Sequence, residues 1–221
     1  MSMLCIVIPT VNQKERLGKA VEYYTKALPN TPIYILDNGK QGLNYDEHKL
    51  VSIRVAPYNF GVSESWNHLL YWAYGQNHDY VWVLNDDVIV EIDEAKINAT
   101  LERYSDADFL VCRPFYNWSS FIIPMQTFFR VGPFDTTFYP CFYEDNDYDY
   151  RISLAKLKKV YADDLNPTVY ANSQSTLAQP ELDNSEKNRK RYITKWGGPP
   201  NAEVYKQPYD GQALDVWMNS L

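Results

Sequence analysis

The chain has 221 residues, a formal net charge of −7 and a pI of about 5.0, which disfavours broad binding of nucleic acid or of an anionic membrane surface. Its 45% hydrophobic and 22% charged residues are ordinary for a soluble globular protein, and its length fits one large domain. The three scattered cysteines, Cys5, Cys112 and Cys141, show no metal-binding spacing and favour a reducing compartment. The start lacks a signal-peptide pattern, and no apolar run approaches the ~18 residues of a membrane span. We therefore expect a soluble protein of the cytoplasm.

The first half of the chain alternates apolar runs with helical patterns, which is typical of an α/β fold. Apolar or alternating runs predict strands over residues 4–8, 33–36, 51–55, 80–84 and 109–112. Apolar residues at helical spacing predict helices over residues 17–28, 63–75 (with Ser63 as its N-cap) and 93–104. The opening strand, helix and strand form a β-α-β unit, whose two strands are expected to be parallel.

Polar side chains directly follow two of these strands. Asn85, Asp86 and Asp87 follow the strand over 80–84, and Asp37 ends the second strand. In open α/β sheets, ligands lie outside the carboxyl ends of the strands. Neighbouring carboxylates repel each other unless a cation lies between them, so we hypothesise that Asp87, with Asp86 or Asn85, holds a divalent metal and a diphosphate. Asp37 is interpreted as an acceptor of a hydrogen bond from a base or ribose. Ordinary Asn/Asp turns would explain both segments without a ligand.

The second half changes character. Residues 115–143 are rich in aromatic residues, Pro and Gly, and we interpret them as strands and loops on the acceptor side of the site. The acids Glu144, Asp145, Asp147 and Asp149 follow, and the apolar spacing predicts a helix from about residue 145 to 158. These acids either include a carboxylate base at the mouth of the site or form an acid-rich helix start, which the helix dipole favours.

The end of the chain holds few signals. Short strands are predicted at residues 160–161 and 168–170, and residues 176–190 are interpreted as a loop or a frayed helix. Lys195 and Trp196 precede a Gly-Gly-Pro-Pro break, where they either contact a diphosphate and a sugar or simply end a helix. A local cluster of cations suits a nucleic acid, although a solvated helix face is the favoured interpretation. The cluster consists of Lys187, Arg189, Lys190 and Arg191.

Taken in order, these segments resemble a family 2-type glycosyltransferase with the GT-A fold, over roughly residues 4–198. The segments that carry the resemblance are Ile8-Pro9-Thr10-Val11-Asn12, Leu36-Asp37-Asn38-Gly39, Asn59-Phe60-Gly61-Val62-Ser63 with Asn67, Leu84-Asn85-Asp86-Asp87 (the DxD-type metal motif), Gly132-Pro133-Phe134-Asp135, Tyr143-Glu144-Asp145-Asn146-Asp147 and Tyr192-Ile193-Thr194-Lys195-Trp196-Gly197-Gly198. The resemblance implies a mostly parallel central sheet flanked by helices. It implies one domain over residues 1–221, with a nucleotide-sugar half at about 1–113, an acceptor half at 114–200 and a tail at 201–221 that packs back.

The resemblance also implies an activity and a set of site residues. The expected reaction is metal-dependent, inverting transfer of a hexosyl or pentosyl group from a nucleoside-diphosphate sugar, most simply a UDP-sugar, to an acceptor hydroxyl. Asp145 would be the general base, with Glu144 beside it, and Asp87 and Asp86 would bind Mn²⁺ or Mg²⁺. The residues implied for donor binding are Pro9, Thr10, Asn12, Asp37, Asn59, Gly61, Asn67, Asn85, Asp86, Lys195 and Trp196.

Two features depart from the family pattern. Asn85 stands where a strict DxD motif has its first Asp, so Asp87 is expected to be the dependable ligand. Family members often carry a late-strand His that completes the metal shell, but residues 169–173 contain none. Either Asn172 supplies an oxygen ligand in its place, or the metal binds only together with the nucleotide.

Two other functions stay open at this point. A nucleotidyltransferase or pyrophosphorylase shares a similar start but usually carries a Gly-rich loop after its first strand, and residues 9–13 contain no Gly. A non-catalytic sugar- or nucleotide-binding module is the third possibility. The acceptor, the sugar and the oligomeric state are not readable, because fold does not dictate them. A glycan or a lipid-linked sugar is the default acceptor, and a protein side chain or a modified DNA base is an alternative.

Overall fold

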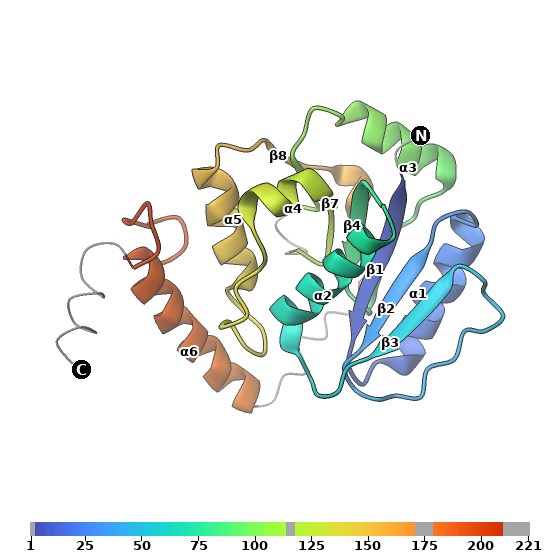
Figure 1. The fold of residues 1–221 in the computed structure, drawn as a ribbon, viewed down its shortest axis with the longest axis horizontal. Helices are drawn as coiled ribbons and strands as arrows, with labels where there is room; N and C mark the ends of the chain where they lie inside the picture. Colours follow the sequence, from blue (N-terminus) through green and yellow to red (C-terminus); the bar gives the residue numbers. More distant parts are fainter. Residues whose placement is uncertain (1–2, 114–117, 171–178, 210–221) are drawn as a thin grey trace.

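A seven-stranded sheet in the order β3-β2-β1-β4-β7-β6-β8 forms the centre of the computed structural model (Figure 1). The structure describes residues 3–113, 118–170 and 179–209. The strands are β1 (Leu4–Thr10), β2 (Ile33–Asp37), β3 (Val51–Val55), β4 (Tyr80–Leu84), β5 (Val88–Ile89), β6 (Phe109–Val111), β7 (Ser120–Pro124), β8 (Lys159–Tyr161) and β9 (Val169–Tyr170). The helices are α1 (Lys14–Ala27), α2 (Gly61–Gly75), α3 (Glu94–Arg103), α4 (Met125–Val131), α5 (Glu144–Leu154), α6 (Gln179–Trp196) and the 3₁₀ turn η2 (Asp163–Leu165). No helix within the described ranges is long and apolar enough to cross a membrane.

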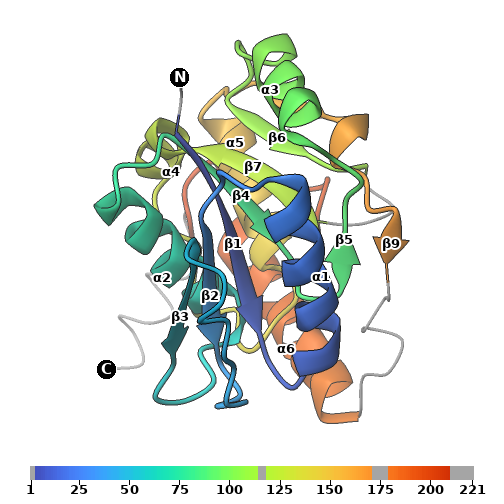
Figure 2. The ribbon, with the colours of Figure 1, turned by 90° about the vertical axis from the view of Figure 1, so that its right-hand side faces the viewer.

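The first four strands of the sheet are parallel, so their carboxyl ends lie at one edge. β1 pairs in parallel with β2 and with β4, and β2 pairs in parallel with β3. In Figure 2, the arrowheads of these strands point in the same direction. β7 is antiparallel to both β4 and β6, whereas β6 and β8 are parallel. β5 and β9 form a separate antiparallel pair, and β5 lies beside α1 in Figure 2. The expected mostly parallel α/β sheet is therefore confirmed.

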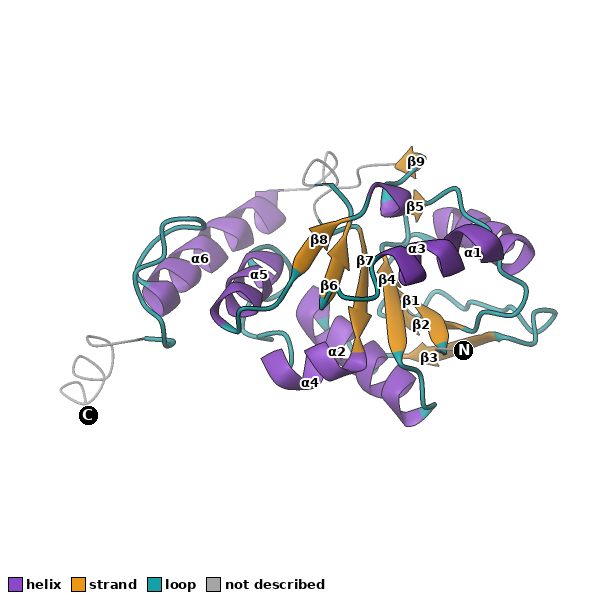
Figure 3. Ribbon diagram, turned by 90° about the horizontal axis from the view of Figure 1, so that it is seen from above, coloured by secondary structure: helices purple, strands orange, loops and turns teal. Residues whose placement is uncertain are grey.

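Helices cover both faces of the sheet, which explains why the central strands are apolar without alternation. In β1, Cys5 and Val7 pack into the core beneath α2, α4 and α5, whereas Ile6 and Ile8 pack into the core beneath α1 and α3. Figure 3, seen from above, shows α1 and α3 on one side of the strands and α2 and α4 on the other. All four side chains are fully buried. A strand buried on both faces needs apolar residues at every position.

The helices differ from the sequence prediction in three places. α4 lies within residues 115–143, where strands and loops were expected, and α6 is a regular helix where residues 176–190 were interpreted as a loop or frayed helix. Packing explains α6, because Tyr192 and Trp196 are buried against Phe138 although most of the helix is polar. α2 begins at Gly61 without a side-chain cap, so the prediction of Ser63 as its N-cap was wrong.

The tail folds back on the end of α6. Val204 and Tyr205 donate their amides to the carbonyl of Trp196 at 2.9 Å, and the amide of Tyr209 donates to the carbonyl of Lys195 at 2.8 Å. These bonds satisfy carbonyl groups that the end of a helix leaves without a partner. The remaining tail residues, 210–221, lie outside the described residues.

The start of α2 touches the loop that precedes α5, and this contact requires a glycine. Gly61 has a φ of +70°, and a Cβ atom built there would lie 2.6 Å from the carbonyl oxygen of Pro140. The amide of Val62 donates to the same oxygen at 2.7 Å. The hydrogen bond thus forms only because residue 61 has no side chain, and it fixes the 139–143 segment against the start of α2.

We predict that Gly61→Ala lowers the free energy of unfolding by about 2–4 kcal/mol, because the left-handed conformation and the overlap with Pro140 both penalise a Cβ. Urea unfolding followed by circular dichroism measures this. Gly75→Ala is the matched control at the other end of α2, where an added Cβ meets nothing within 4 Å. We expect it to change stability by less than about 1 kcal/mol. Equal stability of the two variants would contradict the role of the contact.

Candidate active site

The carboxyl ends of β1, β2 and β4 are tied together by polar contacts. The amide of Asn38 donates to the carbonyl of Thr10 at 2.8 Å, which joins β2 to β1. The amide of Val11 donates to Asp86 Oδ2 at 3.4 Å, and the Thr10 hydroxyl also hydrogen-bonds Asp86, which joins β1 to β4. The structure therefore brings Thr10 and Asp86, two residues predicted from separate strands, into direct contact.

Asp37 is completely buried at the end of β2, and its carboxylate is enclosed by the following loop. Its Oδ1 accepts from the amide of Gly39 at 2.9 Å and from the Gln41 side chain at 3.0 Å, and its Oδ2 accepts from the amide of Gln41 at 2.7 Å. The bonds to Gly39 and Gln41 are those of an Asn/Asp turn. The same carboxylate lies at the end of β2, where the interpretation as an acceptor for a base or ribose places it. Sequence reasoning missed Gln41, because a single glutamine in a loop carries no pattern.

Asp86 and Asp87 form a pair of neighbouring acids directly after β4. Asp87 is only 6% exposed. The pKa of Asp86 is raised to about 6, chiefly by burial and also by the charge of Asp87, although the Thr10 hydroxyl and the Val11 amide oppose the change. A divalent cation that keeps phosphate oxygens as its remaining ligands needs only one or two carboxylates from the protein, so this pair fits such an ion. Within the described residues, no group of three or more His, Cys, Asp or Glu side chains could hold a metal, and Asn172 lies outside them.

The residues predicted around α2 fix the backbone in this structure. Asn59 Oδ1 accepts from the amide of Gly61 at 2.9 Å. Asn67 donates to the carbonyl of Phe134 and accepts from its amide, both at 2.8 Å. The Gly-Pro-Phe-Asp turn is thereby held against α2. Asn67 is buried, and its side chain is committed to this pair of bonds.

Pro9 is partly buried in β1, whereas Asn12 is exposed in the loop that follows.

Two neighbouring acids begin α5: Glu144 is buried, and Asp145 is partly exposed. Burial and the charge of Asp145 raise the pKa of Glu144 well above its usual 4.5. In the part of the chain that the structure describes, Glu144 Oε2 has no hydrogen-bond partner. Asp145 is partly exposed, its Oδ1 accepts from the amide of Asn146 at 2.8 Å, and burial raises its pKa as well. Carboxyl groups whose pKa is raised in this way are frequent in catalytic sites.

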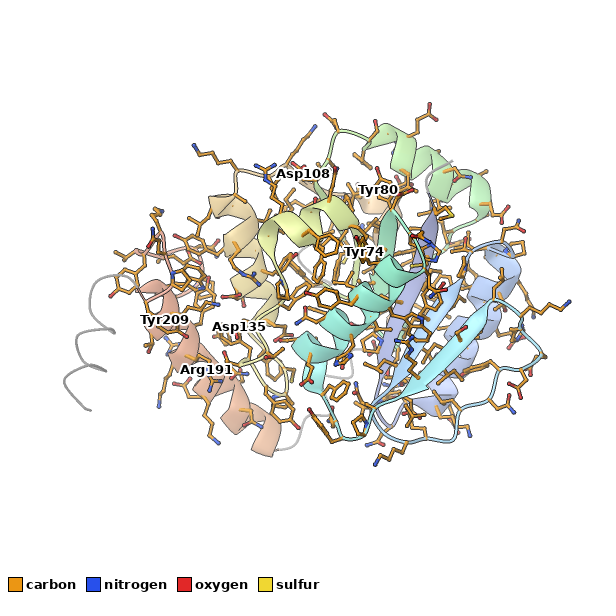
Figure 4. The ribbon with its side chains drawn as sticks, viewed as in Figure 1. Tyr74, Tyr80, Asp108, Asp135, Arg191 and Tyr209 are labelled. Atoms are coloured by element: carbon orange, nitrogen blue, oxygen red, sulfur yellow. The ribbon has the colours of Figure 1, made fainter. Side chains whose placement is uncertain are left out.

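Asn188 of α6 holds the loop that leads into α5. This buried side chain donates to the carbonyl of Cys141 at 2.8 Å and to those of Tyr139 and Phe142 at 3.3 Å. Arg191 donates to Asn188 Oδ1 at 2.9 Å and to the carbonyl of Thr137. One of the four clustered cations therefore has a structural role. In Figure 4, Arg191 lies on α6 beside the loop that carries Asp135.

Lys195 and Trp196 lie in the interior, in a charged network between α5 and α6. Lys195 Nζ contacts Asp135 Oδ2 at 2.7 Å and Asp147 Oδ1 at 2.6 Å, and Lys195 is only 5% exposed. Trp196 Nε1 donates to the same Asp147 oxygen at 2.8 Å, and Arg151 donates to Asp147 Oδ2 at 3.0 Å. Contact with a diphosphate would require Lys195 to leave both carboxylates. The interpretation as a helix end thus accounts for the contacts of these two residues in this structure, and their part in donor binding stays a prediction.

Two groups of predicted residues share one edge of the molecule. Thr10, Asp37, Asp86 and Asp87 lie at the carboxyl ends of β1, β2 and β4. The start of α2 follows β3 at this same edge, and its contact with Pro140 brings the start of α5 there too. Figure 1 shows the first turns of α2 and α5 at the lower edge, where the parallel strands end.

The family model described as Glycosyl transferase family 2 matches residues 5–163, which is more than half of the chain. The chain belongs to this family. The resemblance that the sequence motifs indicated is therefore confirmed. A search of curated protein sequences found no match.

Solved structures with the same GT-A fold resemble this family member at low sequence identity. Staphylococcus aureus TarS (residues 1–349) superimposes with a TM-score of 0.61 and 12% identity, covering 76% of this chain and 59% of the solved TarS chain. GalNAc-T7 with UDP, GalNAc and Mn²⁺ has a TM-score of 0.64 and 14% identity, covering 88% of this chain and 49% of the other. Drosophila β1,4-galactosyltransferase 7 with manganese, UDP-Gal and xylobiose has a TM-score of 0.55 and 14% identity, covering 82% and 79%. The chain thus spans about half to three-fifths of the first two proteins.

We predict that Lys195→Met lowers the free energy of unfolding by about 3 kcal/mol, because it leaves Asp135 and Asp147 without their shared buried cation. Urea unfolding measures the change. Lys190→Met on the same helix is the matched control, since the side chain of Lys190 is 74% exposed. We expect it to alter stability by no more than about 0.5 kcal/mol. If Lys195→Met is as stable as the control, the network does not anchor α6.

Proposed function

We propose that this family 2 member transfers a sugar from a nucleoside-diphosphate sugar to an acceptor hydroxyl, with inversion at the anomeric carbon. The observation that supports the proposal is that Asp86 and Asp87 at the end of β4 and Asp145 at the start of α5 lie toward the same edge of the sheet. Asp86 and Asp87 follow β4 and suit a metal–diphosphate, whereas Asp145 starts α5 and suits a general base. Family membership supports this division of tasks.

The nucleoside is proposed to lie over the ends of β1 and β2. Pro9, Thr10, Asn12 and Asp37 would line this position, with the Thr10 hydroxyl and the Asp37 carboxylate as its hydrogen-bonding groups. We favour uridine as the base, because the similar TarS and GalNAc-T7 structures contain UDP-GlcNAc and UDP, respectively. Asn59, Gly61 and Asn67 would act by shaping the start of α2 and the turn beside it.

A divalent cation, Mn²⁺ or Mg²⁺, is proposed to bind at Asp87 and Asp86, with Asn85 beside them. When bound, such an ion neutralises charge that develops on the departing diphosphate. The raised pKa of Asp86 is caused chiefly by burial and also by the charge of Asp87, and it supports this placement because a bound cation would stabilise the ionised pair. The GalNAc-T7 and Drosophila structures contain Mn²⁺ or manganese together with UDP or UDP-Gal.

Asp145 is proposed to accept the proton of the acceptor hydroxyl as its oxygen attacks the anomeric carbon. The bond from that carbon to the diphosphate oxygen breaks on the opposite side, and the electron pair leaves with the diphosphate. Glu144, whose pKa is raised well above the usual value, is proposed to act as a neutral carboxylic acid that orients a hydroxyl.

A glycan or lipid-linked sugar is the proposed acceptor class, and the xylobiose bound by the Drosophila enzyme supports a glycan. Nucleic acid is disfavoured, because Arg191 of the cation cluster serves the fold.

We predict that Asp145→Asn lowers the turnover number about 10²–10⁴-fold, because the amide cannot accept the proton, whereas donor affinity changes by less than about twofold. The protein is incubated with Mn²⁺ and a panel of nucleotide sugars, and the rate at which nucleoside diphosphate is released measures turnover. Asp149→Asn is the matched control, since Asp149 lies one turn further along α5 and pairs with Lys159. It should keep turnover within a few-fold. Near-normal turnover of Asp145→Asn would refute the base assignment.

The pH dependence follows from the same residue. The base must be ionised, and burial raises the pKa of Asp145 above its usual 3.8. Turnover is therefore expected to be full above the raised pKa and to fall about tenfold per pH unit below it, so that the acidic limb of the profile lies above pH 3.8. Turnover from pH 4 to pH 8, with circular dichroism to confirm folding at each pH, measures the limb. A flat profile down to pH 4 would argue against Asp145 as the base.

A further inference from the structure

The side chain of Gln41 occupies the space over the ends of β1 and β2. Its Nε2 donates to Asp37 Oδ1 at 3.0 Å and to Thr10 Oγ1 at 3.3 Å. Its Oε1 accepts from the amide of Gln13 at 2.8 Å. One carboxamide therefore uses an acceptor at the end of each of two strands and a donor from the loop after β1.

The three partners of this carboxamide form a pattern that also suits a nucleobase. An N–H group beside a carbonyl, as in the edge of uracil formed by N3 and O4, presents one donor next to an acceptor; a primary amide presents the same pair together with a second N–H. Asp37 and Thr10 accept hydrogen bonds on one side, and the amide of Gln13 donates on the other. A base edge that makes these contacts cannot do so while Gln41 makes them.

We propose that Gln41 is an internal competitor for the base of the donor nucleotide, and that its side chain must leave Asp37 before the nucleotide binds. This inference rests on the proposed function, because that function places the nucleoside at Thr10 and Asp37. Competition by the Gln41 side chain would thus lower the affinity of the protein for the nucleotide.

The main chain around Gln41 is held independently of the carboxamide, so the side chain can leave alone. The amides of Gly39 and Gln41 donate to Asp37 at 2.9 and 2.7 Å. Lys14 Nζ contacts the carbonyl of Gly42 at 3.1 Å. After rotation of the Gln41 side chain, Asp37 keeps two backbone donors for its buried charge. Asp37 Oδ1 and Thr10 Oγ1 then each lose one donor and the amide of Gln13 loses its acceptor, so the base can take the place of the carboxamide.

The consequence for affinity is an increase when the competitor is removed. The apparent dissociation constant of a ligand rises by the inverse of the fraction of molecules that are competent to bind. If the carboxamide occupies the position in about nine of ten molecules, Gln41→Ala tightens nucleotide binding about tenfold. Gln41→Asn keeps the amide but is one methylene shorter, so it fails to reach the three partners together and is expected to tighten binding in the same direction.

The experiment is titration calorimetry of UDP, at one fixed Mg²⁺ concentration, into the wild type, Gln41→Ala, Gln41→Asn and Gln76→Ala. Gln76 is an exposed glutamine at the end of α2 that donates to the carbonyl of Gly75 at 3.4 Å, and its replacement controls for loss of a surface amide. The expected result is tighter UDP binding by both Gln41 variants and unchanged binding by Gln76→Ala. Unchanged or weaker binding by both Gln41 variants overturns this inference and leaves the proposed function standing.

Two further measurements separate a failure of this inference from a failure of the proposed function. In ¹⁵N-labelled wild type, the side-chain NH₂ signals of Gln41, assigned by their loss in Gln41→Ala, are expected to shift at UDP saturation; unmoved signals overturn the inference even if a variant folds poorly. Asp37→Asn, checked for folding by circular dichroism, is expected to lose UDP binding. If the wild type binds no nucleotide and releases no nucleoside diphosphate from any sugar donor, the proposed function fails and this inference fails with it.

Discussion

The constraint on which the rest of the structure depends is that β1, β2 and β4, three of the four parallel strands, are buried on both faces. Helices α1 and α3 cover one face and α2, α4 and α5 cover the other, so β1, β2 and β4 carry apolar residues at nearly every position. Polar chemistry is thereby confined to the edge where the strands end. Because the four strands are parallel, the residues that follow them converge there although they are up to 76 positions apart, from Thr10 to Asp86.

The acids at the predicted site and beside α6 fall into two groups according to their surroundings. Asp147 and Asp135 share the buried ammonium of Lys195, and Asp37 is surrounded by N–H donors from its own loop. These bonds pair the carboxylates within the protein and serve the fold. Asp86 and Asp145, by contrast, have raised pKa values, chiefly because burial disfavours their charged forms. A cation, a proton or a substrate hydroxyl is the natural partner for such a group, which is why we place the chemistry there.

The second half of the chain serves mainly to bring α5 to the same edge. Gly61 admits the carbonyl of Pro140, Asn67 holds Phe134, and Asn188 holds three carbonyls of the loop before α5. α6 therefore acts as a clamp on the segment that positions Asp145, and its own attachment depends on the buried charges around Lys195. The same residues give the Lys-Trp segment a structural explanation, where the sequence alone also allowed a contact with the donor.

By itself, the amino-acid sequence determined the α/β class, the parallel first strands and the positions of Asp37, Asp86, Asp87 and Asp145 at element ends, because hydrophobic periodicity and strand termini are local properties. Only the tertiary structure decided what each polar side chain contacts. The burial of Lys195 between two carboxylates, the pairing of Asn67 with Phe134 and the placement of Gln41 on Asp37 all join residues that no local pattern connects. For the same reason the sequence left α6 open between a loop and a frayed helix: its polar residues give little periodicity, and it is stabilised by Tyr192 and Trp196 packing on a distant loop.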